Sequence, residues 1–165
     1  SKASTGNVQI NWTDIDANML LEQAVAEYQD KLECAGLRVV FTKSETPAVI
    51  KADGQHLWRV FDNLLANISK YAMPGTRVYA SVVHSDGSVR IEFKNISREA
   101  LNVSSDELME RFVRGDSSRN TEGSGLGLSI ANSLCTLMKA KFSLNIDGDL
   151  FKAVIVFDDR AVQKQ

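Results

Sequence analysis

The chain has 165 residues, with 19 Lys or Arg and 21 Asp or Glu, so its formal net charge is −2. This length suits one domain with a real core, and the charge argues against a surface built mainly for nucleic acid or anionic membrane. The two cysteines, Cys34 and Cys135, form no CxxC pair and are expected to be small core residues. No apolar run approaches the roughly 20 residues of a membrane helix, and no signal-peptide pattern opens the chain. We expect a cytoplasmic domain without direct membrane insertion.

The first 52 residues predict one helix and three strands. Alternating side chains over 7–12 indicate a strand, and apolar residues spaced by four predict a helix over 14–34. Gly36 stands where a glycine that ends a helix is expected. Short β-branched or apolar runs at 37–42 and 49–52 predict two more strands.

A second helix and a hairpin follow. Asp53 is expected to cap a helix that runs to Ala72 and ends at a Met-Pro-Gly turn. Alternating runs over 76–84 and 88–95 are joined by an Asp-Gly pair, which is the strongest hairpin signal in the chain. These strands are therefore predicted to pair with each other.

Residues 97–122 lack sustained periodicity and predict a long polar loop with one short helical piece around 106–113. A third helix is predicted over 124–138. Two final strands, 140–146 and 150–157, are joined by an Asp-Gly-Asp turn. Three helices and several hairpin-linked strands predict an α+β two-layer sandwich, with a mixed β-sheet covered on one face by three helices.

The second helix carries a polar stripe beside its apolar face. At about 100° per residue, Asn63, Asn67 and Lys70 fall within roughly 60° of one another, and Tyr71 lies at the border of the apolar face. The apolar face is formed by Leu57, Val60, Phe61, Leu64, Leu65 and Ile68. Carboxamide oxygens suit Mg²⁺, and a lysine can meet phosphate charge. The stripe thus has the parts of a phosphate site; the alternative is an ordinary solvated face.

A glycine-rich run, Glu122-Gly-Ser-Gly-Leu-Gly-Leu128, opens the third helix. Glycines let the backbone approach an anion closely, and the first N–H groups of a helix carry its positive end. The run does not follow a strand directly and lacks the GK[ST] sequence, so it is neither a dinucleotide-binding fingerprint nor a P-loop. Taken alone, it also fits a structural turn.

Together these motifs resemble the catalytic, ATP-binding domain of bacterial sensor histidine kinases, of the GHKL superfamily. Residues 63–71 resemble the family's N box, 110–116 its F box and 123–128 its second glycine box. The resemblance covers about 8–157 and implies the Bergerat ATP-binding fold. It implies one ATP-binding domain over 1–165.

The resemblance implies a role for each matching residue. Asn67, supported by Asn63, holds Mg²⁺ between the ATP phosphates. Lys70 contacts phosphate, and Tyr71 packs against adenine.

The glycine box and the F box have implied roles as well. The triphosphate is bound by backbone N–H groups of the glycine box, at Gly123, Gly125, Leu126 and Gly127. Residues 97–122 form a mobile lid over ATP. Phe112 anchors this lid and Arg114 approaches the phosphates.

One motif departs from the family pattern. The first glycine box of the family begins with an aspartate that accepts a hydrogen bond from the adenine amino group. The strand at 88–95 aligns this box with Asn95-Ile96-Ser97, which contains no glycine. Asn95 can still accept a hydrogen bond through its carbonyl oxygen. This departure keeps open a degenerate nucleotide-binding module without transfer activity.

The resemblance implies an enzyme, a protein-histidine kinase that binds Mg-ATP and transfers the γ-phosphoryl group. The acceptor is a histidine on the kinase's own dimerisation domain, which we expect outside this sequence, and a response regulator follows. The full-length protein is expected to be membrane-anchored. His56 and His84 are predicted to be surface histidines and not phosphoacceptors, so the isolated domain should bind ATP without phosphorylating itself. A second alternative is an anti-sigma-type serine kinase on the same fold.

Overall fold

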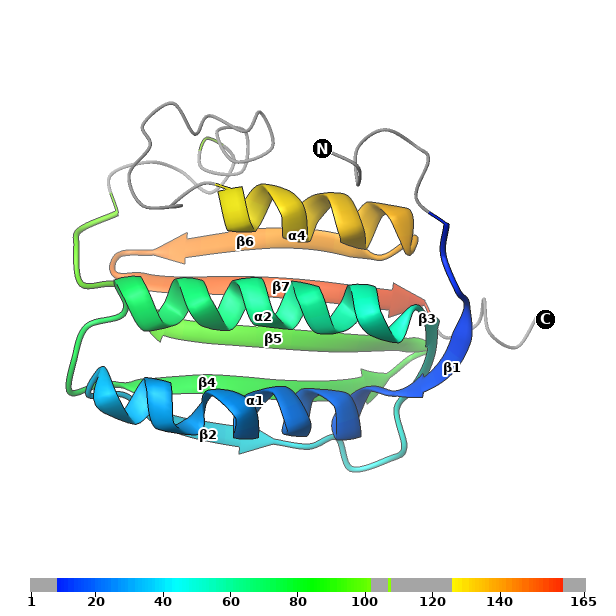
Figure 1. The fold of residues 1–165 in the computed structure, drawn as a ribbon, viewed down its shortest axis with the longest axis horizontal. Coiled ribbons are helices and arrows are strands. Elements are labelled where there is room, and N and C mark those ends of the chain that lie inside the picture. The colour runs from blue at the N-terminus through cyan, green and yellow to red at the C-terminus, as the bar shows by residue number, and fades with distance from the viewer. Residues whose placement is uncertain (1–8, 102–106, 108–125, 159–165) are drawn as a thin grey trace.

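The computed structural model describes residues 9–101, 107 and 126–158 (Figure 1). Its helices and strands, in chain order, are β1 (Thr13–Asp16), α1 (Ala17–Cys34), β2 (Arg38–Thr42), β3 (Val49–Ala52), α2 (Gly54–Tyr71), β4 (Arg77–Ser85), β5 (Ser88–Ile96), α4 (Leu126–Leu137), β6 (Lys141–Asp147) and β7 (Leu150–Asp158).

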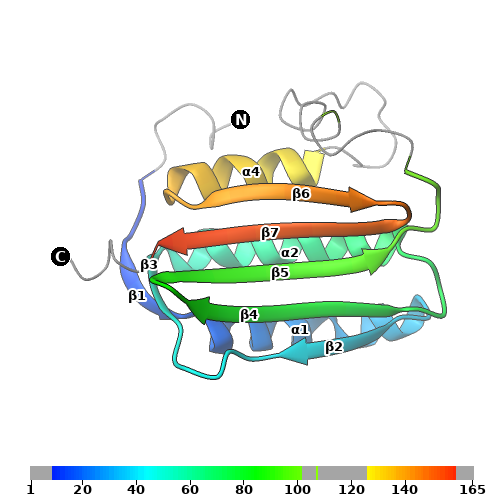
Figure 2. The same cartoon turned by 180° about the vertical axis from the view of Figure 1, so that it is seen from behind.

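The main sheet has five strands in the order β2-β4-β5-β7-β6. β2 runs parallel to β4, and the other neighbours are antiparallel, so the sheet is mixed. Helix α2 lies between α1 and α4, and all three cover one face of the sheet (Figure 1). In the described part of the chain, the opposite face carries no helix (Figure 2). The predicted α+β two-layer sandwich is therefore confirmed.

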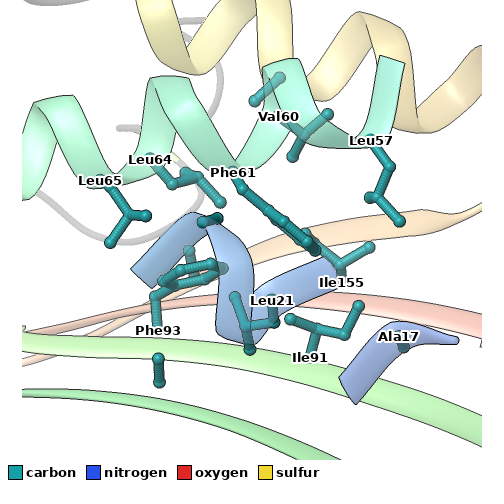
Figure 3. Close-up of a cluster of buried hydrophobic side chains, with 14 of the residues drawn as sticks. Ala17, Leu21, Leu57, Val60, Phe61, Leu64, Leu65, Ile91, Phe93 and Ile155 are labelled. Carbon is teal, nitrogen blue, oxygen red and sulfur yellow. The ribbon is translucent and has the colours of Figure 1, made fainter. Parts of the chain in front are cut away.

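The core lies between the helices and the sheet. All six residues predicted for the apolar face of α2 are buried. Figure 3 shows Phe61 of α2 pointing toward the sheet, where its ring centroid lies 5.8 Å from that of Phe93 on β5. Each side chain of this size contributes roughly 1.5–3 kcal/mol when fully buried. This packing fixes the face that α2 turns to the sheet, and hence where its polar stripe lies.

The hydroxyl of Tyr28 joins α1 to α2. It donates hydrogen bonds to the Oδ1 atom of Asp62, at 2.5 Å, and to the Asp62 carbonyl oxygen, at 3.2 Å. Burial, together with this bond and the negative charge of Asp62, raises the pKa of the Tyr28 phenol. The phenol therefore stays protonated as a donor, and α2 is held from one side by α1.

The first strand lies later than the prediction. Residues 9–12 form no strand, and β1 begins at Thr13, opposite Ala52 of β3. The reason is the partner: β3 has only four residues, and they pair with Thr13–Asp16. The side chain of Asp16 then accepts a hydrogen bond from the N–H of Met19, which starts α1 there.

The prediction for the cysteines is half right. Cys135 of α4 is buried, and burial raises the pKa of its thiol to about 12. Cys34 is exposed, so the prediction that it is a core residue is wrong. It lies two residues after the buried Leu32, which places it about 200° around the helix on the solvent side.

Both histidines, predicted to lie at the surface, are partly exposed. The side chain of His56 is 20% exposed, and its Nε2 lies 3.8 Å from Oδ2 of Asp53 because both belong to the first turn of α2. The Nδ1 atom of His84 lies 2.6 Å from the carbonyl oxygen of Pro47.

Among the described helices, none is long and apolar enough to span a membrane.

Candidate functional site

A cavity of about 210 Å³ lies between the C-terminal half of α2, the sheet and the start of α4. Its lining residues come from α2 (Leu64, Asn67, Ile68, Tyr71), from β5 and the segment after it (Phe93, Asn95, Ser97, Glu99, Leu101), from α4 (Leu128) and from β7 (Phe151, Ala153). Pockets for drug-sized ligands typically measure roughly 300–1,000 Å³. This smaller, mainly apolar cavity therefore suits a single ring system better than a whole nucleotide.

The strand register sets the wall that faces α2. Inward-facing residues alternate along β5, so Phe93 and Asn95 both point toward the helices. On β7 they stand opposite Ala153 and Phe151. Three apolar side chains thus surround one carboxamide on the sheet side of the cavity.

Asn95 is the most deeply buried polar residue of this cavity, with 4% of its surface exposed. Its carboxamide makes no hydrogen bond to any residue in the described ranges. Asn95 is therefore prepared to bind a polar group that enters the cavity.

The two asparagines of the polar stripe lie one helical turn apart. Asn67 lines the cavity, and Asn63 lies one turn nearer the start of α2. The Nδ2 atom of Asn63 is buried and has no hydrogen-bond partner in the described structure. Hard carboxamide oxygens at this spacing fit Mg²⁺, which keeps several waters and takes its remaining ligands from phosphates. The described residues hold no cluster of three His, Cys, Asp or Glu side chains able to bind a metal.

The glycine motif meets the polar stripe at one point. Gly127, in the first turn of α4, faces Asn63: a Cβ atom added to Gly127 would lie 3.8 Å from Cβ of Asn63. Sequence periodicity alone could not bring these two motifs together, because the β4–β5 hairpin and residues 97–125 separate α2 from α4 in the chain. The tertiary structure places them side by side.

The end of α2 is tied to the segment that follows β5. Arg98 donates from Nη2 to the carbonyl oxygen of Lys70, at 2.6 Å, and from its backbone N–H to that of Tyr71, at 2.8 Å. The Lys70 side chain is exposed and does not line the cavity, whereas Tyr71 does. Arg98 thereby positions Tyr71, a role that sequence analysis missed.

The structure brings only some of the predicted site residues to the cavity. Asn67, Tyr71 and Asn95 line it. Phe112 of the F box lies outside the described residues, as do Arg114, Gly123 and Gly125. Leu126 is the first residue of α4.

The missed lining residues include three from elements that the sequence analysis did not connect with the site, β7 and the interior of α4. Phe151, Ala153 and Leu128 belong to apolar segments that the sequence marks only as core. Phe151 and Ala153 reach the cavity through the pairing of β7 with β5, and Leu128 through the packing of α4 beside α2, and neither has a local signal.

Comparison with protein families shows which kind of domain contains this cavity. Residues 52–158 match the model of the family described as histidine kinase-, DNA gyrase B- and HSP90-like ATPase. The chain belongs to this family. The matched range contains α2, the cavity wall on β5 and β7, and α4, so the site lies within the part that defines this ATPase family.

Curated relatives of this ATPase domain include proteins named as sensor proteins or as histidine kinases. It is 27% identical over 162 residues to the probable sensor protein PcoS of Escherichia coli, which covers 96% of this chain and 34% of that protein. It is 30% identical over 132 residues to the signal transduction histidine-protein kinase BaeS of Escherichia coli K12, covering 79% of this chain and 28% of that protein. The chain thus spans about a third of the length of these relatives.

Solved structures share the fold of this ATPase domain. The nucleotide-free catalytic domain of histidine kinase ThkA matches with a TM-score of 0.78 at 16% identity, covering 90% of this chain and 96% of that one. Histidine kinase AdeS of Acinetobacter baumannii matches with a TM-score of 0.75 at 17% identity, covering 94% and 71%. The predicted resemblance to the ATP-binding domains of sensor histidine kinases is confirmed.

Proposed function

We propose that this domain binds Mg-ATP in the cavity and transfers the γ-phosphoryl group to a histidine on a separate dimerisation domain of the same kinase. The observation that carries the proposal is the convergence of Asn67, Tyr71 and Asn95 on one cavity inside the family-matched range. Phosphoryl transfer depends mainly on positioning and charge neutralisation. This domain therefore needs only to orient the nucleotide and neutralise its charge, and the nucleophile is the histidine of the dimerisation domain.

In this proposal the base occupies the cavity. Tyr71 packs against its ring, and the apolar side chains of Leu64, Phe93 and Phe151 exclude water from it. Asn95 meets a polar group on the edge of the base. Because Arg98 fixes the backbone at Tyr71, this wall is in place before the nucleotide arrives.

The phosphates are proposed to lie toward the start of α4. Asn67 and Asn63 would hold Mg²⁺, which neutralises phosphate charge when bound. Lys70 is exposed on the same stripe and would meet a phosphate oxygen. The backbone of Gly127 is proposed to approach the phosphates, where its missing side chain leaves room.

The remaining roles follow the resemblance alone. Gly123, Gly125 and Leu126 are proposed to contribute backbone N–H groups. Phe112 and Arg114 are proposed to belong to a lid over ATP.

The whole protein is proposed to be a membrane-anchored kinase that carries this domain in the cytoplasm and passes phosphate to a response regulator. PcoS is named as a probable sensor protein and BaeS as a signal transduction histidine-protein kinase, which favours this function over a serine kinase or a module without transfer activity.

Calorimetric titration of the Asn67→Ala variant with ATP, with and without Mg²⁺, tests the proposal. We expect Mg²⁺-dependent binding in the wild type and its loss in the variant. The fold should persist, because Asn67 is half-buried and belongs to no core cluster. Asn145→Ala is the matched control, since Asn145 is exposed on β6 and should leave the affinity unchanged. Equal Mg-ATP affinity in wild type and Asn67→Ala would refute the site.

A further inference from the structure

Five residues with polar side-chain groups line the cavity, and only one combines deep burial with an unused side chain. Glu99 is exposed, and Asn67 and Tyr71 are half-buried. Ser97 is buried, but its hydroxyl donates to the carbonyl oxygen of Glu99, at 2.7 Å, and accepts from the N–H of Glu99, at 3.3 Å. The carboxamide of Asn95 forms no hydrogen bond with any residue of the described structure. Its carboxamide is thus the polar group that a buried ring edge will meet.

A carboxamide offers two kinds of hydrogen bond. Its oxygen accepts and its nitrogen donates, and rotation of the terminal torsion exchanges their places. Phe93 and Phe151, which flank Asn95 on the sheet side of the cavity, are apolar, and no described residue bonds to its carboxamide, so no hydrogen bond fixes one orientation. Either orientation is therefore available to a ligand.

The two purine classes present opposite patterns at the edge that such an amide reads. A 6-amino purine such as adenine has an exocyclic N–H donor beside the N1 acceptor. A 6-oxo purine such as hypoxanthine or guanine has the O6 acceptor beside an N1–H donor. One amide can pair with either pattern after rotation. A carboxylate at the same position only accepts, so it would pair with the amino group and repel O6.

We propose that Asn95 makes this cavity accept 6-oxo purine nucleotides as well as ATP. The inference rests on the proposed function, because it requires the purine base to occupy the cavity. Ser97, the other buried polar side chain of the cavity, is already bonded to Glu99, so the 6-position is left to Asn95. Discrimination between the two purine classes therefore depends on the chemistry of this one side chain.

Competition binding of ATP and ITP in the presence of Mg²⁺ tests the proposal. ITP carries the 6-oxo edge without the 2-amino group of GTP, so it isolates the contact at the 6-position. In the wild type we expect dissociation constants that differ by less than about fivefold, the lower bound for a buried group left unpaired. In Asn95→Asp we expect a preference for ATP of roughly 5- to 150-fold.

Asn145→Asp is the matched control, because it makes the same chemical change on the exposed face of β6. It should keep the wild-type ratio. Thermal unfolding shows whether each variant is folded. The ratio of the ITP and ATP dissociation constants in the wild type tests the proposal without any variant.

The outcomes separate the two proposals. A wild type that binds neither nucleotide overturns the proposed function, and the inference with it. A wild type that binds ATP but disfavours ITP by more than about fivefold overturns the inference alone. An Asn95→Asp variant that is folded and keeps the wild-type ratio does the same.

Discussion

Gly127 of α4 stands against Asn63 of α2, so closely that a Cβ atom on Gly127 would lie 3.8 Å from Cβ and 3.9 Å from the backbone oxygen of Asn63. Both distances are ordinary van der Waals contacts, so packing alone does not require a glycine here. A helix position also favours alanine over glycine by roughly 0.5–1 kcal/mol. A glycine at this position therefore makes the helix less stable than an alanine would. Such a glycine is expected where a ligand approaches the backbone.

We therefore predict that Gly127→Ala leaves the ligand-free fold intact or stabilises it by up to about 1 kcal/mol, and weakens Mg-ATP binding. The added methyl group occupies space that the phosphates need. Thermal unfolding, with an expected rise of up to about 4 °C, and calorimetric titration measure the two effects.

Gly54→Ala is the matched control for this substitution. Gly54 also opens a helix, and its added Cβ would lie 3.6 Å from the side chain of Ile15. It stands about 20 Å along α2 from Asn67, since 13 residues rise by about 1.5 Å each. Nucleotide affinity should be unchanged. An equal loss of affinity in both variants would show that the effect does not arise at the phosphates.

The described histidines lie far from the cavity, so the isolated domain should not phosphorylate itself. His56 precedes Asn67 by 11 residues of α2, or about 17 Å. His84 lies near the β4–β5 hairpin, at the opposite end of β5 from Asn95, about 20 Å along the strands.

We expect no acid-labile phosphate on the isolated domain after incubation with γ-labelled ATP. A dimerisation domain from a related sensor kinase, added in trans, should become labelled if it is accepted. The double variant His56→Gln/His84→Gln should give the same background as the wild type. Label that disappears in the double variant would contradict the prediction.

Asp53 joins the start of α2 to the N-terminal segment. Its carboxylate accepts from the N–H groups of Asn11, at 2.8 Å, Gln55, at 3.0 Å, and His56, at 3.1 Å. Burial acts to raise the pKa of Asp53, but the hydrogen bonds from Asn11 and His56, the His56 imidazole and the bond from Gln55 outweigh it and lower the pKa. Because the pKa of Asp53 is lower in the folded state, its ionised form stabilises the fold at any pH above the ordinary pKa of an aspartate. This contribution is lost as the pH falls below about 4 and the carboxylate is protonated.

Asp53→Ala should therefore lower the free energy of unfolding by about 1–3 kcal/mol near neutral pH, through the lost helix cap and the lost bond to Asn11. The difference from wild type should shrink as the pH falls from 5 toward 3, within the range where urea denaturation is still reversible. Asp30→Ala removes an exposed carboxylate of α1 and is the matched control. A difference for Asp53→Ala that stays constant across this range would contradict the linkage.

Local sequence signals predicted the elements well wherever one short pattern is enough. The apolar face of α2, the hairpin between β4 and β5, and the glycine after α1 were all predicted correctly. In the hairpin turn, Asp86 and Gly87 adopt φ angles of 52° and 77°, and Gly36 adopts 78°. Such left-handed conformations favour glycine and aspartate, so the residues themselves indicate the turns.

Two predictions were wrong, the position of the first strand and the burial of Cys34. Residues 7–12 alternate like a strand, but four-residue β3 pairs with Thr13–Asp16 instead. Cys34 and Leu32 both lie at the end of an amphipathic helix, yet only Leu32 faces the core. The apolar residues spaced by four already set the phase of this helix, and Cys34 lies about 200° from Leu32, so this error came from not applying that phase at the helix end.

The motifs themselves determined the family and the identity of most proposed ligand contacts, because their residue types and spacing are local properties of the chain. The cavity was decided by tertiary structure. Phe151 and Ala153 face Asn95 and Phe93 only through the register of β7 against β5, and Gly127 meets Asn63 only because α4 packs beside α2. These contacts join segments far apart in the chain, and their free energy comes from burying a shared core, which no local pattern specifies.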